Sequence, residues 1–363
     1  MSWPRFWTET TWQTLALMPL SKLVCWEASR RLKHFEASQP AQQTPAKVVV
    51  VGNVVVGGSG KTPFIVWLAT HLMEEGIHVG IISRGYGGQS KTWPMQVTAE
   101  SDPKVVGDEP VLLAKQLHCP IAVSPKRSEA IALLTQIQKQ AGLADLEVII
   151  SDDGLQHYAM SRDIEIVLID AQRQFGNEYC MPAGPLREPV ERINTVDFCI
   201  WNGLAQHDRF TPPKGLKAMR QDIHFRMNLQ PLCFRQVGDA TIRLSVDDFI
   251  AQYGGGTGEG MVNAMAGIGN PTRFFESLVK MGFKVTETAF SDHYAYQLSD
   301  FEGFADEKPL LMTEKDAVKC SEMALIHQKT NWWYLEVAPI CDEPLFSQLF
   351  ARLNIKTMLK TTS

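Results

Sequence analysis

A glycine-rich run near residue 60 has the composition and spacing of a phosphate-binding loop. It follows a hydrophobic segment, opens a predicted helix, and consists of Gly57, Gly58, Ser59, Gly60, Lys61 and Thr62. Glycines allow backbone N–H groups to face phosphate oxygens, and the helix N-terminus adds positive potential. We expect the Lys61 ammonium to reach the β- and γ-phosphates of a nucleotide and the Thr62 hydroxyl to bind Mg²⁺. The loop is a variant, because Val55 stands where the general pattern has its first glycine.

Carboxylates at two other places could bind a metal ion or accept a proton. Asp152 and Asp153 follow the hydrophobic segment 148–151, as in a Walker B strand. Asp108 and Glu109 lie in a Gly-Asp-Glu-Pro sequence at the start of a predicted helix. The first pair could also be an ordinary turn, and the second an ordinary helix cap. Beside a phosphate loop, the first pair favours phosphoryl transfer, which needs Mg²⁺ ligands and a group that orients the attacking hydroxyl.

Arginines and histidines add candidate contacts for a phosphorylated substrate. Arg84 and Arg187 could bind phosphate, because a guanidinium forms bidentate pairs with it, although either could be an ordinary surface arginine. His157 follows the carboxylate pair at 152–153 closely and adds a polar group at the same edge of the sheet. His293 stands beside an aspartate in the second half of the chain, a setting that is more often structural than functional.

Alternating strands and helices in the first 200 residues predict a doubly wound α/β fold. The consecutive valines in segment 46–52 suit a strand that is buried on both faces of a parallel sheet. The predicted strands are 46–52, 77–83, 121–124, 147–151, 164–170 and 196–201, and the predicted helices are 61–75, 109–117 and 127–141. The stretch 85–106 is rich in glycine, serine and proline, which is typical of a lid or a disordered segment.

The pattern of alternating strand and helix signals changes after residue 204. Residues 219–245 alternate and carry few helix signals, so we expect an antiparallel ribbon or a small sheet. The further predicted strands are 261–266, 284–290, 310–313 and 332–338, and the further predicted helices are 270–281 and 343–357. We therefore expect three parts: a helical segment at 1–35, a P-loop nucleotide-binding domain at 36–204 and a smaller α/β lobe at 205–363.

Tryptophans and basic residues gather in the first 35 residues. This stretch holds Trp3, Trp7, Trp12 and Trp26 of the nine tryptophans in the chain. Its apolar run, 15–26, is interrupted and is shorter than the roughly 18–20 apolar residues needed to span a bilayer. Tryptophan favours the headgroup level and basic residues favour anionic lipid, so we expect a segment that lies in the membrane interface. A soluble helix pair that packs its aromatic residues on the protein body is the alternative.

Composition narrows the class of protein. The chain has 363 residues, of which 45% are hydrophobic and 21% charged, as in a globular protein with a sizeable core. A net charge of −5 provides no overall basic field for nucleic acid, so we expect no nucleic-acid partner. The seven cysteines are scattered and form no Cys-x-x-Cys pair. That disfavours a disulfide framework and a zinc site, and it favours a reducing compartment.

The motifs, taken in order along residues 46–319, resemble the lipid A 4′-kinase (tetraacyldisaccharide 4′-kinase) family. They read GNVVVGGSGKTP, SRGYGG, GDEP, DDGLQH, PAGPLREP, AGIGNPTRFF, SDHY and TEKDAVK. The resemblance implies a kinase that uses ATP and Mg²⁺ to phosphorylate the 4′-hydroxyl of a tetraacylated glucosamine disaccharide 1-phosphate, a late step in lipid A synthesis. It also implies a peripheral enzyme on the cytoplasmic face of the bacterial inner membrane.

The same resemblance implies roles for individual side chains. Asp108 is the expected base on the sugar hydroxyl, assisted by His293. Lys61 and Thr62 are expected to bind the ATP phosphates and Mg²⁺, and Glu109 and Asp153 to bind the metal or its water shell. The residues expected to line the substrate site are Arg84, Asp152, His157, Arg187 and Glu188.

Two other functions fit parts of the sequence. One is a membrane-tethered GTPase or ATPase that signals by changing conformation. A guanine-specific switch carries Asn/Thr-Lys-x-Asp, and the nearest match, Thr-Glu-Lys-Asp at 313–316, is out of register by one residue. The other is a P-loop kinase for a small soluble alcohol, and the tryptophan-rich basic segment at 1–35 argues against it.

Overall fold

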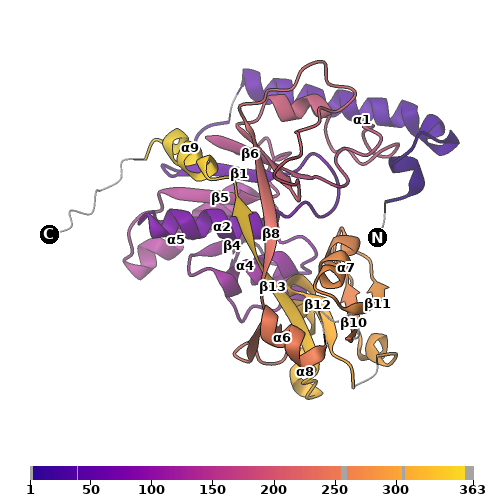
Figure 1. Ribbon diagram of the computed structural model, residues 1–363. Helices are drawn as coiled ribbons and strands as arrows, with labels where there is room; N and C mark the ends of the chain where they lie inside the picture. The colour runs from indigo at the N-terminus through magenta and orange to yellow at the C-terminus, as the bar shows by residue number, and fades with distance from the viewer. Residues whose placement is uncertain (1–2, 39, 255–259, 305–306, 356–363) are drawn as a thin grey trace.

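One mixed β-sheet of 13 strands runs through the whole molecule. The computed structural model describes residues 3–38, 40–254, 260–304 and 307–355 (Figure 1). The strand order is β11-β10-β12-β13-β8-β7-β6-β1-β5-β2-β4-β3, and β9 pairs with β8. The β13–β8, β3–β4 and β8–β9 pairs are antiparallel, and the other pairs are parallel. The predicted α/β fold with a mostly parallel sheet is confirmed.

The N-terminal half of the sheet matches the predicted strands closely. Its strands are β1 (Lys47–Gly52), β2 (Val79–Ser83), β3 (Met95–Val97), β4 (Ile121–Val123), β5 (Val148–Asp152), β6 (Ile164–Asp170) and β7 (Phe198–Asn202). Its helices are α2 (Lys61–Glu74), α3 (Pro103–Val106), α4 (Asp108–Gln116), α5 (Arg127–Ala141) and the 3₁₀ helix η2 (Val190–Asn194). The stretch 85–106, expected to be irregular, contains β3 and α3.

The valines of β1 show why this strand lies at the centre. Successive side chains of a strand point to opposite faces, so one strand can contribute to two cores. Val49 and Val51 pack in the cluster that contains side chains of α2 and α4, and Val48 and Val50 pack in the cluster that contains side chains of α5. Burial on both faces is the arrangement that a run of consecutive valines favours.

The C-terminal half continues the sheet with further parallel strands. They are β10 (Met261–Ala266), β11 (Lys284–Ala289) and β12 (Leu310–Thr313). The helices here are α6 (Val246–Tyr253), α7 (Pro271–Lys280), α8 (Glu314–Ile326) and the 3₁₀ helix η3 (Leu298–Phe301). The predicted strands and helices of this half therefore form, and they enclose hydrophobic clusters of their own.

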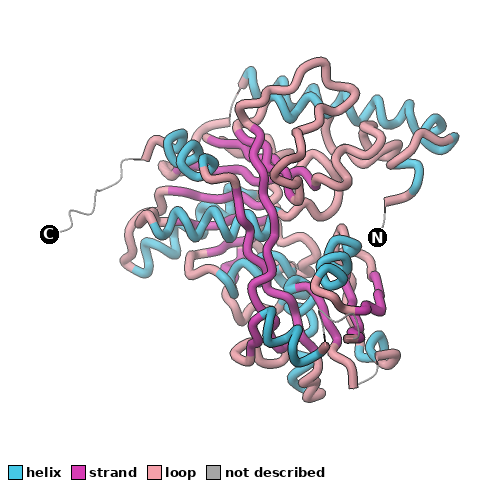
Figure 2. The backbone as a smooth tube through the Cα atoms, in the orientation of Figure 1, coloured by secondary structure: helices cyan, strands magenta, loops and turns pink. Residues whose placement is uncertain are grey.

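Two long antiparallel strands join the halves. They are β8 (His224–Gln236) and β13 (Trp332–Cys341), which run side by side down the molecule (Figure 2). The antiparallel structure expected in 219–245 exists, because β8 also pairs with the short β9 (Arg243–Ser245). It is not a separate small sheet, since β8 pairs with β7 in parallel and so extends the main sheet. Alternation predicts an extended chain and does not identify the partner strand.

The end of the chain returns to the N-terminal half. Helix α9 (Pro344–Leu353) follows β13, and its buried leucines belong to the same core as α2 and α4. The predicted helix at 343–357 thus forms in part, and its residues 356–357 lie outside the described residues. Elements of the last 30 described residues therefore complete both halves of the fold.

The N-terminal segment forms a short 3₁₀ helix, η1 (Arg5–Trp7), and a long helix, α1 (Trp12–Ala37). Trp7 Nε1 donates a hydrogen bond to the carbonyl oxygen of Pro182 at 2.9 Å, so this end of the segment is anchored to the body. Residues 1–2 of the predicted segment lie outside the described residues. Among the residues that the structure describes, no helix has the length and apolar character to cross a membrane.

A disulfide joins α1 to the body, which the cysteine spacing did not lead us to expect. Cys25 in α1 bonds to Cys180, with 5.8 Å between their Cα atoms, and 155 residues separate them in the sequence. Ser21 Oγ donates a hydrogen bond to the carbonyl oxygen of Cys180 at 2.7 Å and ties the same turn of α1 to the same loop. This pairing depends on how α1 packs, which counts and spacings of cysteines do not reveal.

Candidate active site

The phosphate loop lies between β1 and α2 and is shaped by two asparagines. Asn53 Nδ2 donates to the carbonyl oxygen of Gly57 at 3.1 Å, and Asn202 Nδ2 donates to the carbonyl oxygen of Ser59 at 3.1 Å. Gly57 and Gly60 have φ values of 103° and 89°, which L side chains rarely adopt. These glycines are therefore required by the path of the loop. The Thr62 hydroxyl makes no hydrogen bond within the described residues, which leaves it available as a ligand.

A loop from the C-terminal half packs directly on the phosphate loop. A Cβ on Gly269 would lie only 2.0 Å from the backbone nitrogen of Gly58, so the two backbones approach as closely as glycines allow. The next residue, Asn270, donates from Nδ2 to Asp170 Oδ2 at 3.1 Å, at the end of β6. The β10–α7 loop is thereby fixed against both the phosphate loop and the neighbouring strand end.

Lys61, Asp153 and Arg187 form a charged group next to the phosphate loop. Lys61 Nζ lies 3.4 Å from Asp153 Oδ1, and Arg187 Nη1 donates to the two oxygens of Asp153 at 2.9 and 3.0 Å. Burial raises the pKa of Asp153, but the charges of Lys61 and Arg187 outweigh burial and lower it overall. Asp153 has a φ of 46°, unusual for a residue other than glycine and frequent at functional sites. Its carboxylate is therefore ionised and held beside Lys61.

The neighbouring carboxylate, Asp152, has an unsatisfied oxygen. Ser83 Oγ donates to Asp152 Oδ2 at 3.0 Å, whereas the buried Oδ1 has no hydrogen-bond partner. Burial, followed by the negative charge of Glu109, raises the pKa of Asp152 to about 7. The buried Arg127 holds this strand end in place, because its Nη2 donates to the carbonyl oxygen of Asp152 at 2.8 Å. An unpaired carboxylate oxygen beside a second acidic group is suited to a cation.

Asp108 and His293 meet across the two halves of the sheet. Asp108 is the first residue of α4, His293 follows β11, and His293 Nδ1 lies 3.1 and 3.2 Å from the two oxygens of Asp108. Burial raises the pKa of Asp108, but the His293 hydrogen bond and the charge of Lys315 lower it overall, to about 2. Burial lowers the pKa of His293, but the Asp108 hydrogen bond leaves it raised overall. The Tyr86 ring lies 5.0 Å from the imidazole, which places the 84–88 loop beside the pair.

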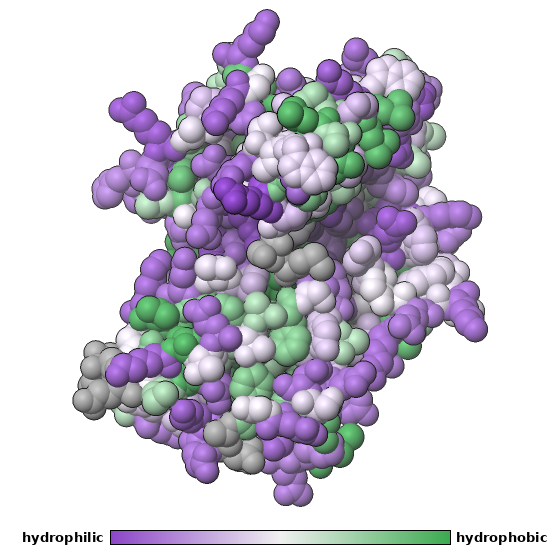
Figure 3. All heavy atoms as spheres, turned by 90° about the vertical axis from the view of Figure 1, so that its right-hand side faces the viewer, coloured by the Kyte–Doolittle hydropathy of each residue, from purple (hydrophilic) through white to green (hydrophobic). Residues whose placement is uncertain are grey.

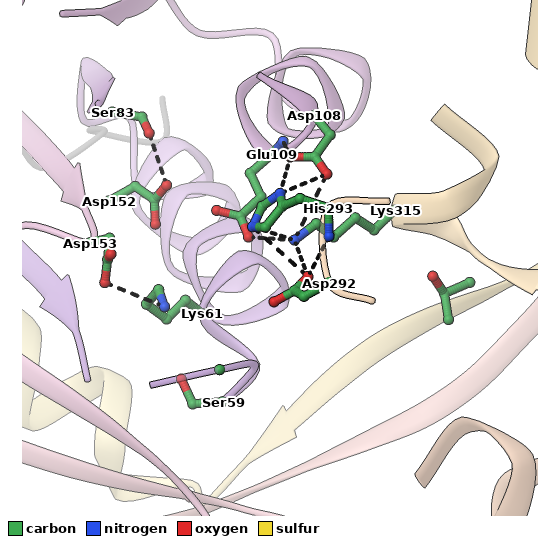
Figure 4. Close-up of polar contacts among 12 residues, drawn as sticks. Ser59, Lys61, Ser83, Asp108, Glu109, Asp152, Asp153, Asp292, His293 and Lys315 are labelled. Atoms are coloured by element: carbon green, nitrogen blue, oxygen red, sulfur yellow. Dashed lines mark hydrogen bonds and ion pairs between the residues drawn. The ribbon is translucent and has the colours of Figure 1, made fainter. Parts of the chain in front are cut away.

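Lys315 completes this cluster and was not predicted from the sequence. Its Nζ lies 2.9 Å from Glu109 Oε1 and 3.3 Å from Asp292 Oδ1, next to the Asp108–His293 pair (Figure 4). The TEKDAVK motif contains it, but a lysine at the start of a helix has no local feature that distinguishes it from a surface residue. Arg127 was missed for a similar reason, because its burial beneath Asp152 depends on tertiary packing.

Three of the predicted substrate residues take no part in the contacts around Asp153 and around the Asp108–His293 pair. Arg84 is exposed and, within the described residues, makes no hydrogen bond or ion pair. His157 is half-buried, and burial together with nearby arginines lowers its pKa to about 4. Glu188 is only 2% exposed, and its carboxylate binds the Tyr158 hydroxyl and Gln156 Nε2. This burial disfavours direct contact between Glu188 and a sugar, because its oxygens are already used inside the protein.

The site has oxygen ligands of the kind that the Mg²⁺ ion of an ATP complex would need. The free hydroxyl of Thr62, the unpaired oxygen of Asp152 and the carboxylate of Glu109 are hard oxygen ligands, which Mg²⁺ prefers. Among the described residues, no three His, Cys, Asp or Glu side chains are already grouped to hold a metal ion. Mg²⁺ in kinases commonly binds through one or two carboxylates together with phosphate oxygens and water, so these residues fit it.

Comparison with known proteins identifies the family. The family model for tetraacyldisaccharide-1-phosphate 4′-kinase matches residues 13–354. The chain belongs to this family. A tetraacyldisaccharide 4′-kinase from Hydrogenovibrio crunogenus is 52% identical, with 98% of each chain covered, and one from Pasteurella multocida is 42% identical, with 92% of this chain and 93% of the relative covered. The predicted resemblance to the 4′-kinase family is confirmed.

A solved structure supports the same conclusion. The crystal structure of the 4′-kinase LpxK from Aquifex aeolicus, in complex with ATP, matches with a TM-score of 0.70 and 26% identity. The match covers 94% of this chain and 99% of the Aquifex chain. The ATP in that complex agrees with the nucleotide predicted from the phosphate loop. This chain therefore has the fold of a solved 4′-kinase structure.

Proposed function

We infer that this chain is an ATP-dependent lipid kinase that phosphorylates the 4′-hydroxyl of tetraacyldisaccharide 1-phosphate in lipid A biosynthesis. The observation that carries the inference is the position of the Asp108–His293 pair. It lies across from a phosphate loop whose Lys61 is already held by Asp153 (Figure 4), in a chain of the 4′-kinase family. A nucleotide-binding loop and a proton acceptor on opposite sides of one site are what transfer to an alcohol requires.

The residues on the nucleotide side would bind and orient ATP. Lys61 would contact the β- and γ-phosphates, and Thr62, Glu109 and Asp152 would hold Mg²⁺ directly or through water. When bound, Mg²⁺ would neutralise charge on the transferring phosphoryl group. Asp153, which we expected among the metal ligands, is occupied by Lys61 and Arg187, and this favours a role in positioning Lys61.

Asp108 would act on the attacking alcohol. Its carboxylate is ionised at neutral pH, because its pKa is about 2. It would accept a hydrogen bond from the 4′-hydroxyl and take the proton as the oxygen–phosphorus bond forms and the bond to ADP breaks. His293 would fix the orientation of the carboxylate through Nδ1. A carboxylate with so low a pKa is a weak base. It therefore takes the proton late, when the attacking oxygen has already formed most of its bond to phosphorus.

Substrate contacts are proposed on the surface around this centre. Arg84 and His157 stay candidates for the disaccharide, because both lie near the end of the sheet that carries Asp152. Arg187 would contact the substrate only by sharing its guanidinium with Asp153. For Glu188 we propose a positioning role, since it holds Tyr158 and Gln156 rather than facing solvent.

The structure offers no support for a guanine-nucleotide switch. The Thr313–Asp316 sequence would have to present its aspartate to a base. Instead, Asp316 is buried and accepts hydrogen bonds from Tyr296 Oη at 2.9 Å, Thr313 Oγ1 at 2.6 Å and the Gly267 backbone N–H at 3.1 Å. These contacts give Asp316 a structural role.

Transfer of labelled γ-phosphate tests the proposed function. Wild-type enzyme is incubated with ATP and a detergent-dispersed tetraacyl disaccharide 1-phosphate, with and without Mg²⁺. We expect label in the lipid only when Mg²⁺ is present. Hydrolysis of ATP at the same rate with and without lipid, and no labelled lipid, would contradict a kinase and support a nucleotide switch.

For the whole protein, we propose a division of the chain into two lobes and a position at a membrane. The predicted parts, 36–204 and 205–363, would be two lobes, with ATP bound on the first and His293 supplied by the second, and the segment 1–35 would lie on the cytoplasmic face of the inner membrane. Large apolar side chains of α1 support a position in a membrane interface, because they are exposed on the surface (Figure 3). The exposed ones are Trp12, Leu15, Leu20, Leu23 and Trp26, with Trp12 74% and Trp26 61% exposed.

The spacing of these side chains suits a helix that lies flat on lipid. Residues 12, 15, 23 and 26 recur at intervals that share one side of a helix. Arg30 follows on the same side, where its guanidinium donates to Glu27 at 2.6 and 2.8 Å, and would meet anionic headgroups only by sharing that pair. Changing Trp12 and Trp26 to serine should weaken cosedimentation with vesicles containing anionic lipid, while activity on a water-soluble acceptor analogue should persist. Unchanged vesicle binding would contradict the interface proposal.

A further inference from the structure

The side chain of Lys315 extends from the C-terminal half of the sheet into the catalytic cluster. Lys315 is the second residue of α8, which begins directly after β12 with Thr313 as its cap. Its side chain is only 15% exposed, so the ammonium group is largely removed from water. A nearly buried lysine is stable only when negative groups surround it. The groups that do so here come from both halves of the site.

The ammonium group contacts acidic residues on both sides. From α4, Glu109 Oε1 lies at 2.9 Å and Asp108 Oδ2 at 3.9 Å from Lys315 Nζ. From the loop after β11, Asp292 Oδ1 lies at 3.3 Å and His293 Nε2 at 3.5 Å. The Lys315 ammonium group therefore lies among three carboxylates and next to the imidazole that orients Asp108 (Figure 4).

Without this cation the cluster would carry unbalanced charge. Three carboxylates around one imidazole repel one another, and at such short distances in a partly buried site the repulsion is weakly screened. Glu109 would then lose its ion-pair partner at 2.9 Å, and Asp108 would lose one of the positive charges that lower its pKa. No group from α8 in the C-terminal half would then fix the distance between Asp108 and His293.

We propose that Lys315 is a positioning residue of the transfer reaction, whose ammonium group holds the Asp108–His293 pair in its working geometry. The proposal rests on the kinase function inferred above. Lys315 donates hydrogen bonds to Glu109 and Asp292, which are the immediate neighbours of the pair in the chain, and its Nζ also lies 3.5 Å from His293 Nε2. It thus sets the position of Asp108 from one side and that of His293 from the other. It need not touch the substrate.

Substitutions of Lys315 test the proposal kinetically. Lys315→Met keeps the length of the side chain and removes the charge, and Lys315→Arg restores a charge. We expect Lys315→Met to lower kcat by about 10- to 100-fold, less than the full contribution of a general base, with the KM for ATP changed by less than about threefold. Lys315→Arg should recover a large part of kcat. Lys280→Met, which removes an exposed lysine at the end of α7, should behave as wild type.

The geometry of His293 provides a second readout that needs no turnover. In ¹⁵N-histidine-labelled enzyme without nucleotide, at one fixed pH, the ring resonances of His293 are assigned by comparison with His293→Gln. We expect them to move in Lys315→Met and to return toward their wild-type positions in Lys315→Arg. Thermal unfolding shows whether each variant is folded. If Lys315→Met does not fold, Lys315→Gln takes its place.

The two readouts separate this inference from the proposed function. If folded Lys315→Met retains kcat within about twofold and the His293 resonances stay in place, Lys315 is not a positioning residue and the kinase function stands. If the arginine variant is as slow as the methionine variant and its His293 resonances are equally displaced, charge is not what Lys315 supplies. If wild-type enzyme transfers no phosphate to the lipid, the proposed function fails, and the His293 resonances alone decide on Lys315.

Discussion

Lys61 is the residue whose removal should affect chemistry most directly. Lys61→Ala removes the charge beside Asp153 that would stabilise the transferring phosphoryl group, so we expect kcat to fall by a factor on the order of 10² or more. The measurement is turnover at saturating ATP. Lys47→Ala is the matched control, because Lys47 pairs with Asp163 at the other end of the sheet and should leave turnover unchanged. Turnover near the wild-type value in Lys61→Ala would contradict the assignment.

The Asp108–His293 pair should also make stability depend on pH. The pKa of His293 is raised in the folded protein, so its stabilising contribution is complete below the unfolded pKa of about 6.5 and is lost as pH rises through the folded pKa. The pKa of Asp108 falls from 3.8 to about 2, so its contribution is present above the unfolded value and is lost as pH falls toward 2. Together, they stabilise the fold most between about pH 4 and 6.5.

Urea unfolding of His293→Ala tests this dependence. The loss in free energy of unfolding relative to wild type should be larger at pH 5.5 than at pH 9, because the charged pair with Asp108 is lost as pH rises through the raised pKa of His293. His118→Ala, at an exposed position, is the control and should show a similar difference at both pH values. Equal losses at pH 5.5 and 9 for His293→Ala would mean that no ion pair forms with Asp108.

Residue types and order predicted much of this site, and packing decided the rest. The phosphate loop, the two acidic pairs and His293 were identifiable because each has a local pattern. The structure brings Asp108 and His293 together across 185 residues of sequence. Lys315 and Arg127 have no such pattern, since their importance comes from burial next to groups distant in sequence. The buried position of Glu188 could not be predicted for the same reason.

At the scale of elements, the β10–α7 loop should control how well the two sides of the site meet. Gly269→Ala would place a Cβ about 2.0 Å from the backbone nitrogen of Gly58, and neither backbone can yield easily. We expect the loop to move away from the phosphate loop and kcat/KM for ATP to fall by about 10- to 100-fold, as misplacement by an ångström can do. Steady-state kinetics measure the effect.

Gly303 provides a matched control for this change. A Cβ on Gly303 would meet nothing within 4 Å, so Gly303→Ala should leave kcat/KM unchanged. If Gly269→Ala retains wild-type kcat/KM, the close approach of the two loops has no part in catalysis. A fall in thermal stability without a change in kcat/KM would assign the contact to folding alone.

The elements themselves followed from local patterns to different degrees. The buried strand β1 and the helix after the phosphate loop were predicted nearly to their ends, because consecutive valines and a glycine-rich loop have few other interpretations. The pairing of β8 with both β7 and β13 could not be predicted, since alternation leaves the partner open. The Cys25–Cys180 bond depends on the same kind of long-range contact.

At the scale of the molecule, the continuous sheet should couple the unfolding of both halves. The strand β8 belongs to two cores, because Phe225 and Met227 pack in the core of the N-terminal half and Phe234 packs in that of the C-terminal half. Helix α9, which follows β13, returns to the N-terminal core. Neither half can therefore lose its core without withdrawing a strand or a helix from the other.

Phe234→Ala tests this coupling. The Phe234 side chain is fully buried and stacks on Phe249, so its truncation should cost about 3–5 kcal/mol, a typical value for a core phenylalanine. The measurement uses single-tryptophan variants that retain Trp201 in the N-terminal half or Trp333 in the C-terminal half. We expect both to report the same lower urea midpoint, because β8 packs in both cores and the loss of stability in one core therefore destabilises the other. If only the Trp333 signal shifts and the Trp201 signal keeps its wild-type midpoint, the halves unfold independently. The shared strands would then be a mechanical link between two separately stable units.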